Sequence, residues 1–384
     1  MAGLTLASAF EYIINAFNLE ISRVDALQEF IVNARPLASL EYLAGGAILL
    51  VALFFAVRGA GRTERFGPVW NWMLGFVAVL GLAQADSLAT AATSNTYRGL
   101  PAAGTPFHSA VNANGIATPG KRKRNLVVIL VEALGRPVFP EGRKLFEADW
   151  HRTEWNGRYT VSSGEIPYFG STTNGELREL CGVYSNYDAF DFEHRPCMPG
   201  RYAKAGYDTL AIHAFDGKFF DRAAWWPRAG FAHTMFRRQL EEGGARKCGG
   251  MWPGACDVDI AGQIGHRLKT AGKPQFIYWV TLNTHLPVLA GATPGMGGCE
   301  DGTAPLAGMG LMRCRLFVAY HDVAQAISVL AMDPDLPPTD FLIVGDHMPP
   351  FMNRNERLAF DGYTVPWIFL QSKDHAPESG TPAS

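Results

Sequence analysis

The stretch from Gly170 to Thr173 reads Gly-Ser-Thr-Thr and stands directly before residues 174–180, whose composition is largely helical. These hydroxyls would lie at a helix N-terminus, where unpaired backbone N–H groups and the helix dipole attract phosphate or sulfate. With a metal ion nearby, a threonine there could act as a nucleophile. The alternative is structural: a Ser or Thr N-cap, with Glu176 completing a capping box.

Carboxylate and histidine side chains follow four apolar runs that are typical of strands buried on both faces of a parallel sheet. The runs are Leu126–Val131 before Glu132, Thr209–Ile212 before His213, Phe276–Leu282 leading to His285, and Phe341–Val344 before Gly345, Asp346 and His347. Because parallel strands end at the same edge of a sheet, these side chains are expected to converge. For Glu132 alone, a helix-terminus or solvated-turn carboxylate is the alternative.

Helical stretches separate these runs, and a last strand is expected at Val365–Leu370. Strands alternating with helices predict an α/β fold with a central, mostly parallel sheet flanked by helices. We expect this domain to cover residues 125–375, followed by a tail over residues 376–384.

Glu132, Asp346 and His347, together with one threonine oxygen, would form a mixed oxygen and nitrogen ligand set. Such a set suits a divalent metal ion such as Zn or Mn, or Mg where waters complete the shell. A metal bound there would activate the threonine hydroxyl and polarise a phosphoryl oxygen. His285 and Arg222 could help to neutralise the phosphoryl oxygens. Taken alone, His285 would more often be a structural histidine, and Arg222 would more often be a surface charge.

These motifs together resemble the sulfatase-like branch of the alkaline phosphatase superfamily. The resemblance covers residues 125–371 and rests on the strand before Glu132, the Gly170-Ser171-Thr172 turn, Asn283-Thr284-His285 and Gly345-Asp346-His347. Within the branch, the sequence is most similar to membrane-anchored lipoteichoic acid synthases and to phosphoglycerol and phosphoethanolamine transferases. The resemblance implies an alkaline-phosphatase-like fold and metal-dependent phosphoryl transfer.

The resemblance also implies roles for individual residues. The metal ligands would be Glu132, Thr172, Asp346 and His347. Thr172 would be the nucleophile, or Thr173 if the turn is offset by one residue. His285 would contact the substrate phosphate. Residues 213–222 resemble the stretch that binds the donor headgroup, so His213, Phe220 and Arg222 are expected to bind substrate.

The sequence departs from the family pattern in two ways, one that concerns the substrate and one that concerns the membrane region. Phosphoethanolamine transferases usually carry a further histidine shortly after the Asp-His pair, and none lies between Met348 and Thr364. This favours phosphoglycerol or another headgroup as the transferred group. The expected membrane region is also shorter than the usual multi-span anchor of the family.

A competing nucleophile is present in Cys197-Met198-Pro199-Gly200-Arg201, which matches the C-x-P-x-R pattern that sulfatases convert to formylglycine. Against it, Pro-Gly disfavours a helix start that would present residue 197 to a metal, and residues 202–212 suggest a short helix and then a strand. Cys181 is also a plausible disulfide partner of Cys197.

All six cysteines follow residue 180 and form three pairs that are close in sequence. This arrangement favours disulfides formed outside the cytoplasm, whereas a zinc site is not supported by any C-x-x-C spacing. The expected pairs are Cys181 with Cys197, Cys248 with Cys256, and Cys299 with Cys314.

The N-terminal third of the chain predicts membrane association. Residues 1–36 mix apolar and charged residues and suggest an amphipathic interfacial segment. Residues 37–86 contain two apolar stretches that are expected to span the membrane, with buried core helices as the alternative. The hairpin between them carries Arg58, Arg62 and Arg65 and should face the cytoplasm. Residues 87–124 resemble a linker, and the catalytic domain would then lie on the periplasmic side of the inner membrane.

A formal net charge of -2 gives no electrostatic reason to expect nucleic acid as a partner. The resulting hypothesis is a membrane-anchored transferase that moves the headgroup phosphate of a phospholipid donor onto a cell-surface glycan or glycolipid through a phosphothreonine. The alternatives are a hydrolase of the same superfamily, either a sulfatase or a phosphodiesterase, and an inactive protein that binds a glycan or acts as a scaffold.

Overall fold

The structure, a computed structural model, describes residues 99–249, 252–295, 297–351 and 353–373, together with ten residues between 46 and 77. The chain divides into two compact units, Met1–Tyr97 and Arg98–Ser384. The predicted interfacial segment 1–36, most of the two predicted spans, residues 87–98 of the predicted linker and the tail lie outside the described residues. Among the residues that are described, no helix has the length and apolarity needed to cross a bilayer.

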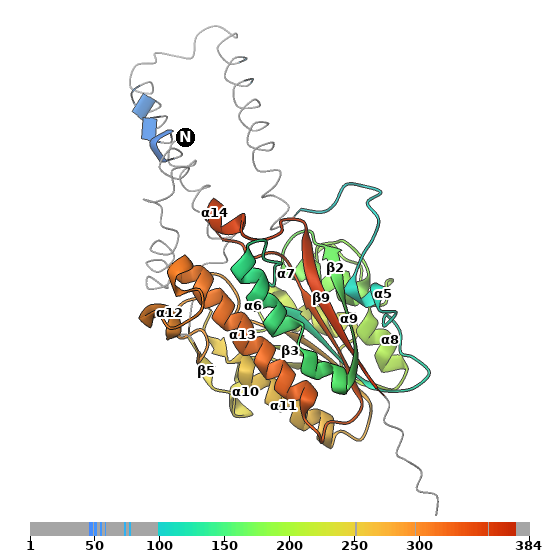
Figure 1. Cartoon of the computed structure of the whole chain (residues 1–384). Helices are drawn as coiled ribbons and strands as arrows, with labels where there is room; N and C mark the ends of the chain where they lie inside the picture. Colours follow the sequence, from blue (N-terminus) through green and yellow to red (C-terminus); the bar gives the residue numbers. More distant parts are fainter. Residues whose placement is uncertain are drawn as a thin grey trace, which may run out of the picture. The chain divides into compact units, whose positions relative to one another are not determined.

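A seven-stranded sheet forms the centre of the second unit (Figure 1), and its strands run in the order β2-β9-β8-β1-β7-β3-β4. Their bounds are β1 Asn125–Val131, β2 Tyr159–Pro167, β3 Asp208–His213, β4 His233–Met235, β7 Gln275–Val280, β8 Thr339–Gly345 and β9 Thr364–Ser372. A separate hairpin pairs β5, Lys247–Cys248, with β6, Gly254–Ala255.

The four predicted strands before the candidate site residues are β1, β3, β7 and β8, and they pair in parallel with one another. Every residue of β1 and β7 is buried, which accounts for their continuous apolar sequence. The strand predicted at the C-terminus is β9, which runs antiparallel to both β8 and β2. Residues 346–363 connect β8 to β9 with only the short helix α14 (Arg354–Arg357), too little for a parallel crossover.

Helices cover both faces of the sheet (Figure 1). On one face lie α6 (Pro140–Trp150), α11 (Asp257–Thr270) and α13 (Leu311–Met332), and on the other lie α5 (Ala110–Ala113), α7 (Thr172–Cys181), α8 (Met198–Lys204) and α9 (Arg222–Ala229). The remaining short elements are η2 Thr153–Gly157, η3 Phe219–Asp221, α10 Arg237–Glu242, α12 Gly298–Asp301 and η4 Ala307–Met309. The predicted α/β architecture is therefore confirmed.

The described part of the predicted linker, residues 99–124, already packs on the domain. In α5, Ala110 and Val111 are buried, and the backbone N–H of Val111 donates to Oε2 of Glu179 over 2.9 Å. The hydroxyl of Tyr184 lies 3.1 Å from the backbone nitrogen of His108. Packing against α7 thus begins before the first strand of the sheet.

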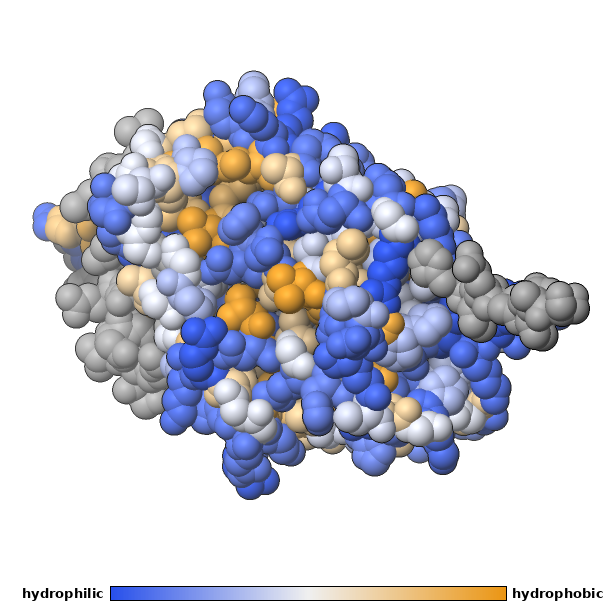
Figure 2. All heavy atoms as spheres, turned by 60° about the horizontal axis from the view of Figure 1, so that its bottom comes forward, coloured by the Kyte–Doolittle hydropathy of each residue, from blue (hydrophilic) through white to orange (hydrophobic). Residues whose placement is uncertain are grey.

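The three predicted disulfides are confirmed: Cys181–Cys197, Cys248–Cys256 and Cys299–Cys314. Cys181–Cys197 joins the end of α7 to the N-cap of α8, Cys248–Cys256 joins β5 to the N-cap of α11, and Cys299–Cys314 joins α12 to α13. The domain surface is mixed in character on the face that Figure 2 shows, where hydrophobic residues form small groups separated by hydrophilic ones.

Candidate active site

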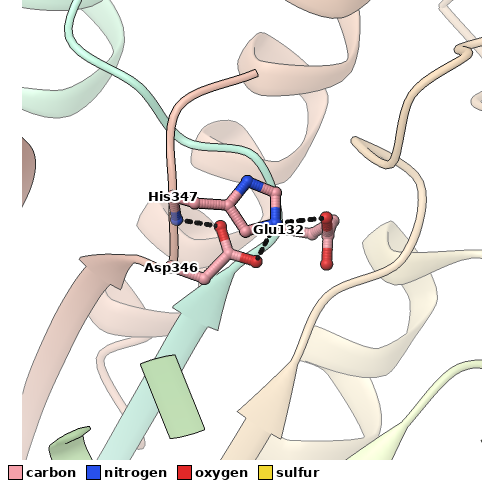
Figure 3. A group of neighbouring side chains, drawn as sticks. All are labelled: Glu132, Asp346 and His347. Atoms are coloured by element: carbon pink, nitrogen blue, oxygen red, sulfur yellow. Dashed lines mark hydrogen bonds and ion pairs between the residues drawn. The ribbon is translucent and has the colours of Figure 1, made fainter. Parts of the chain in front are cut away.

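Glu132, Asp346 and His347 meet at the edge of the sheet where β1 and β8 end (Figure 3). One ligand atom from each lies within 4.8 Å of the others, and the three residues are 4%, 1% and 3% exposed. The convergence follows from register, since Val131, which precedes Glu132, pairs with Gly345, which precedes Asp346. Two parallel strands therefore deliver three donor groups to one point.

Hydrogen bonds fix the orientation of these side chains. Oδ1 of Asp346 accepts from the backbone nitrogens of Ala133 at 2.8 Å and His347 at 2.6 Å. Nδ1 of His347 lies 2.8 Å from the carbonyl oxygen of Met348, which leaves Nε2 to face the carboxylates. Nε2 is 3.4 Å from Oε1 of Glu132 and 3.3 Å from Oδ2 of Asp346.

The electrostatics of this cluster suit a cation. Burial, and after it the nearby charge of Glu132, raise the pKa of Asp346 to about 7. Burial alone would lower the pKa of His347, but Asp346 and Glu132 outweigh it and the net shift is upward. Oδ2 of Asp346 is buried without a hydrogen-bond partner. Two buried carboxylates and an imidazole nitrogen are donors that a divalent metal ion would satisfy.

Thr172 is the first residue of α7, and its hydroxyl points into the same cluster. Oγ1 donates to Oε2 of Glu132 over 2.8 Å and lies 3.5 Å from Nε2 of His347. The hydroxyl of Thr173 instead lies 3.2 Å from Oγ of Ser171. Of the two threonines considered from the sequence, Thr172 is thus the one that meets the predicted ligands.

The predicted helix start is confirmed, but its cap differs from the one expected. Ser171 is the N-cap, and its backbone nitrogen donates to Oδ1 of Asn174 over 2.8 Å. Glu176 does not complete the capping box, because its carboxylate is buried and accepts from Arg222 and Trp226. The N-cap Ser171 and the candidate nucleophile Thr172 are therefore neighbouring residues at this turn.

Gly175 lets α7 approach the cluster closely. A Cβ atom on this residue would lie 3.1 Å from Cβ of Asp346 and 3.2 Å from its Cα. One turn further along, Arg178 donates to the carbonyl oxygens of Gly345 at 2.7 Å and Asp346 at 3.2 Å. These two contacts lock α7 against the end of β8, and sequence reasoning assigned neither residue a role.

Glu132 is held by a strained turn that the sequence did not reveal. Ala133 has a φ of 54°, a left-handed conformation that is uncommon for a residue with a side chain. The backbone nitrogen of Glu132 donates to Oγ1 of Thr281 at 3.0 Å, and its carbonyl oxygen accepts from Thr284 at 2.6 Å. Tyr320 donates to the carbonyl oxygen of Ala133. Left-handed residues held in this way often occur at functional sites.

His213 is the last residue of β3, and His285 lies shortly after the end of β7, as predicted. Burial lowers the pKa of His285 to about 4 and lowers that of His213 well below its usual value, so both rings are neutral at pH 7. Nδ1 of His213 lies 3.2 Å from the carbonyl oxygen of Val280, while its Nε2 is buried without a partner among the described residues. Their substrate contacts stay a prediction.

Arg222 is a buried residue and not a surface charge. It is 1% exposed, and its Nε and Nη2 each lie 2.8 Å from Oε1 of Glu176. Its guanidinium carbon is 5.3 Å from the ring centroid of Phe220, which is half-buried and has a φ of 54°. The predicted binding stretch is thus anchored to α7 by a buried ion pair, and the roles of Phe220 and Arg222 toward substrate stay predictions.

The competing nucleophile lies in a different environment. Contrary to the expectation from Pro-Gly, α8 does begin at Met198 with Cys197 as its N-cap. Pro199 stands in the first turn, where a missing N–H leaves no hydrogen bond unmade. The Cys197 sulfur, however, is bonded to Cys181 at the C-terminal end of α7. In this structure, Cys197 is therefore not a thiol available for conversion to formylglycine.

Solved structures with a similar fold include a protein of the alkaline phosphatase superfamily from Vibrio parahaemolyticus, at 18% identity and a TM-score of 0.48. That match covers 67% of this chain and 62% of the Vibrio chain. The lipoteichoic acid synthase LtaP from Listeria monocytogenes matches at 16% identity and a TM-score of 0.45, over 73% of this chain and 71% of the other. The phosphoethanolamine transferase EptA from Neisseria meningitidis matches at 15% identity and a TM-score of 0.47. That match covers 87% of this chain and 62% of the EptA chain.

No curated protein matches this sequence. The model of the sulfatase family, by contrast, matches residues 124–379, which is most of the chain and includes every candidate site residue. Its match starts at the residue before β1, the strand that presents Glu132, and runs past the end of β9. The chain therefore belongs to the sulfatase family.

Proposed function

We propose that this protein transfers the headgroup phosphate of a phospholipid onto a cell-surface glycan or glycolipid, with Thr172 as the nucleophile. The observation that carries the proposal is the hydroxyl of Thr172, 2.8 Å from Glu132 and at the N-terminus of α7, beside a cluster of buried donor groups. A helix N-terminus favours the charge of a phosphate diester.

A divalent cation, Zn, Mn or Mg, fits this cluster, with Glu132, Asp346, His347 and Thr172 as the residues that would hold it. When bound, such an ion supplies Lewis-acid stabilisation of charge on the phosphoryl oxygens. The unpartnered Oδ2 of Asp346 and the upward pKa shifts of Asp346 and His347 support this assignment.

The chain's own residues can carry the proton transfer at Thr172. As Oγ1 of Thr172 bonds to phosphorus, its proton can pass to Oε2 of Glu132, which already accepts its hydrogen bond. The bond between phosphorus and the diacylglycerol oxygen breaks, and that oxygen takes up a proton from the solvent while the N–H of a neutral His285 could donate a hydrogen bond to it. A glycan hydroxyl then attacks the phosphothreonine and releases its proton to the solvent, and Glu132 returns the first proton to Oγ1 of Thr172.

His213 favours a headgroup that presents hydrogen-bond donors. If its Nδ1 donates to the carbonyl oxygen of Val280, the unpartnered Nε2 carries a lone pair and can only accept. Glycerol hydroxyls and the ammonium group of ethanolamine both provide donors of this kind. The preference for phosphoglycerol as the transferred group therefore rests on the missing histidine between Met348 and Thr364.

The same residues would also support hydrolysis, with water in place of the glycan hydroxyl. The test is to incubate the full-length protein, loaded with Zn²⁺ or Mn²⁺, with headgroup-labelled phosphatidylglycerol or phosphatidylethanolamine, with and without a glycan acceptor. Acceptor-dependent transfer of label to the glycan, with release of diacylglycerol, is expected.

Other outcomes of this experiment distinguish the remaining functions. Release of the labelled headgroup phosphate to water, unaffected by the glycan, would indicate a phosphodiesterase. Turnover of an aryl sulfate would indicate a sulfatase. Glycan binding with no turnover of any of these substrates would indicate an inactive binding protein and would overturn the proposal.

A further inference from the structure

Trp252 contacts His285 from within the loop that the Cys248–Cys256 disulfide closes. Only 9% of Trp252 is exposed, and its ring centroid lies 5.4 Å from that of His285 in an edge-to-face arrangement. The Trp252 ring centroid also lies 5.2 Å from that of Phe219 and 5.9 Å from that of Phe215. The indole nitrogen Nε1 lies 3.0 Å from Nδ1 of His285 with the geometry of a hydrogen bond.

Nδ1 of His285 has two close neighbours that make opposite demands. The indole N–H of Trp252 can only donate, so it requires a lone pair on Nδ1. The carbonyl oxygen of Leu286, 2.7 Å away, can only accept, so it requires a proton there. A neutral imidazole carries one proton, and burial keeps His285 neutral by lowering its pKa to about 4. The two contacts therefore correspond to two tautomers, and only one can be satisfied at a time.

The energetic balance favours the contact with the indole. If Nδ1 were protonated, the buried N–H of Trp252 would face another N–H and be left as an unsatisfied buried donor. In the other tautomer, the Leu286 carbonyl loses the hydrogen bond from Nδ1. Buried carbonyl groups, with two lone pairs, go under-satisfied more often than N–H groups go unpaired.

We infer that Trp252 is a positioning residue that holds the proton of His285 on Nε2, so that His285 presents a donor to the substrate. His213 would have the opposite tautomer, because its Nδ1 faces the carbonyl oxygen of Val280. The two neutral histidines would then offer one donor and one acceptor.

The assignment of this donor to a phosphate or leaving oxygen rests on the proposed function, whereas the tautomer itself does not.

A second contact holds the segment before His285 in place. Oδ2 of Asp257, the residue after Cys256, accepts from the backbone nitrogens of Leu282 at 2.8 Å and Asn283 at 2.7 Å. Trp252 and Asp257, on either side of Cys256 in the sequence, therefore both form hydrogen bonds to residues 282–285.

The test is the protonation pattern of His285, read from two-bond ¹H–¹⁵N spectra of the Zn²⁺-loaded full-length protein labelled at histidine. The His285→Gln variant assigns the signals. In the wild type, Nε2 is expected to carry the proton, and in Trp252→Phe, which keeps an aromatic ring but lacks the N–H, the proton should move toward Nδ1. Loss of one hydrogen bond of this kind should lower kcat about tenfold with KM nearly unchanged.

Trp155→Phe is the matched control, since Trp155 is also buried and its Nε1 donates to Ser328 over 2.9 Å, with no contact to His285. It should leave the His285 signals as in the wild type. A wild-type proton on Nδ1 would overturn the inference, and this measurement needs no variant to fold. An Nε2 proton that is unmoved by Trp252→Phe would also overturn it. A tautomer change in a protein that transfers no headgroup would support the inference while rejecting the proposed function.

Discussion

Two helix N-termini in this domain present a residue that could act as a nucleophile, and they differ in what surrounds it. Thr172 begins α7, with its hydroxyl 2.8 Å from Glu132 and 3.5 Å from His347. Cys197 caps α8, and its sulfur is bonded to Cys181 at the other end of α7. The two N-caps, Ser171 and Cys197, both have an extended backbone, but Thr172 follows its cap whereas Cys197 is the cap itself.

The comparison shows that a helix N-terminus becomes a candidate site only where other elements bring charged groups to it. At Thr172, the ends of β1 and β8 supply two carboxylates and an imidazole. At Cys197, the C-x-P-x-R pattern reproduces the helix start, but its cysteine serves as a cross-link. Cys197 therefore has the sequence motif and the helix-start position of a sulfatase nucleophile, but its sulfur is bonded to Cys181.

The largest effect is expected for Thr172→Ala. Removal of the nucleophile should lower turnover by about 10³-fold or more, with thermal stability and bound metal largely kept. Thr173→Ala is the control, since the Thr173 hydroxyl faces Ser171 and not Glu132. Headgroup transfer assays on both variants check this; an active Thr172→Ala with an inactive Thr173→Ala would move the nucleophile by one residue.

Asp346→Asn should abolish metal retention. Loss of one ligand is expected to weaken cation binding by about 100-fold or more, which elemental analysis after dialysis would measure. Without metal, the variant should melt at a higher temperature than the wild type at pH 8, because one of two buried carboxylates is then neutral. A lower melting temperature for the metal-free variant would indicate a structural role instead.

Replacing both Cys181 and Cys197 with serine should leave turnover within a few-fold of the wild type, yet lower the free energy of unfolding by about 3 kcal/mol. Cys299 with Cys314 is a matched control, because the two disulfides close loops of 16 and 15 residues. Both double variants should lose similar stability in urea unfolding. Loss of activity in a folded Cys181→Ser, Cys197→Ser protein, with formylglycine at 197 in the wild type, would favour the sulfatase alternative.

A third helix N-terminus, that of α11, carries a buried acid in place of a nucleophile, and the effect expected there is a smaller one, on the pH dependence of stability. Asp257 begins α11, and burial raises its pKa to about 7. The folded protein thus holds this proton more tightly than the unfolded chain, in which the pKa of the Asp257 carboxyl is near 3.8. Wild-type stability should therefore fall, relative to Asp257→Asn, as the pH rises from about 4 to about 7, by up to about 1.4 kcal/mol per unit.

Urea midpoints at pH 5 and pH 8 would measure this difference. Asp259→Asn on the same helix is the control with the opposite sign, because the hydrogen bond from Arg246 lowers the pKa of Asp259 despite partial burial. Its wild-type contribution should be lost as the pH falls below about 4. Equal pH slopes for the wild type and Asp257→Asn would contradict the assignment.

The sequence predicted the parts of the fold that have strong local signals. Continuous apolar runs identified β1, β3, β7 and β8, and the parallel order then brought Glu132 and Asp346 together. β2 was missed because it lies at the edge of the sheet, and its sequence Tyr159–Pro167 is largely polar and exposed. β4 has only three residues, too few for a period to show.

Features that depend on contacts between distant segments were not predictable. Asn174 replaced Glu176 in the capping box because Arg222, 46 residues away, takes the carboxylate of Glu176. The hydrogen bond from Trp252 to His285 joins side chains that are 33 residues apart in the sequence. Trp252 lies in the loop that the Cys248–Cys256 disulfide closes. A pattern search places residues on elements, whereas these pairings arise only once the elements pack.

The buried ion pair of Arg222 and Glu176 changes how substitutions in the headgroup-binding stretch should be interpreted. Arg222→Ala would strand a carboxylate in the protein interior and disturb α7, the helix that begins with Thr172, so a decline in catalysis would report on folding as well as on recognition. The paired variant Arg222→Met with Glu176→Gln removes both charges together. Comparing the single and paired variants would separate what the guanidinium does for the substrate from what it does for the helix.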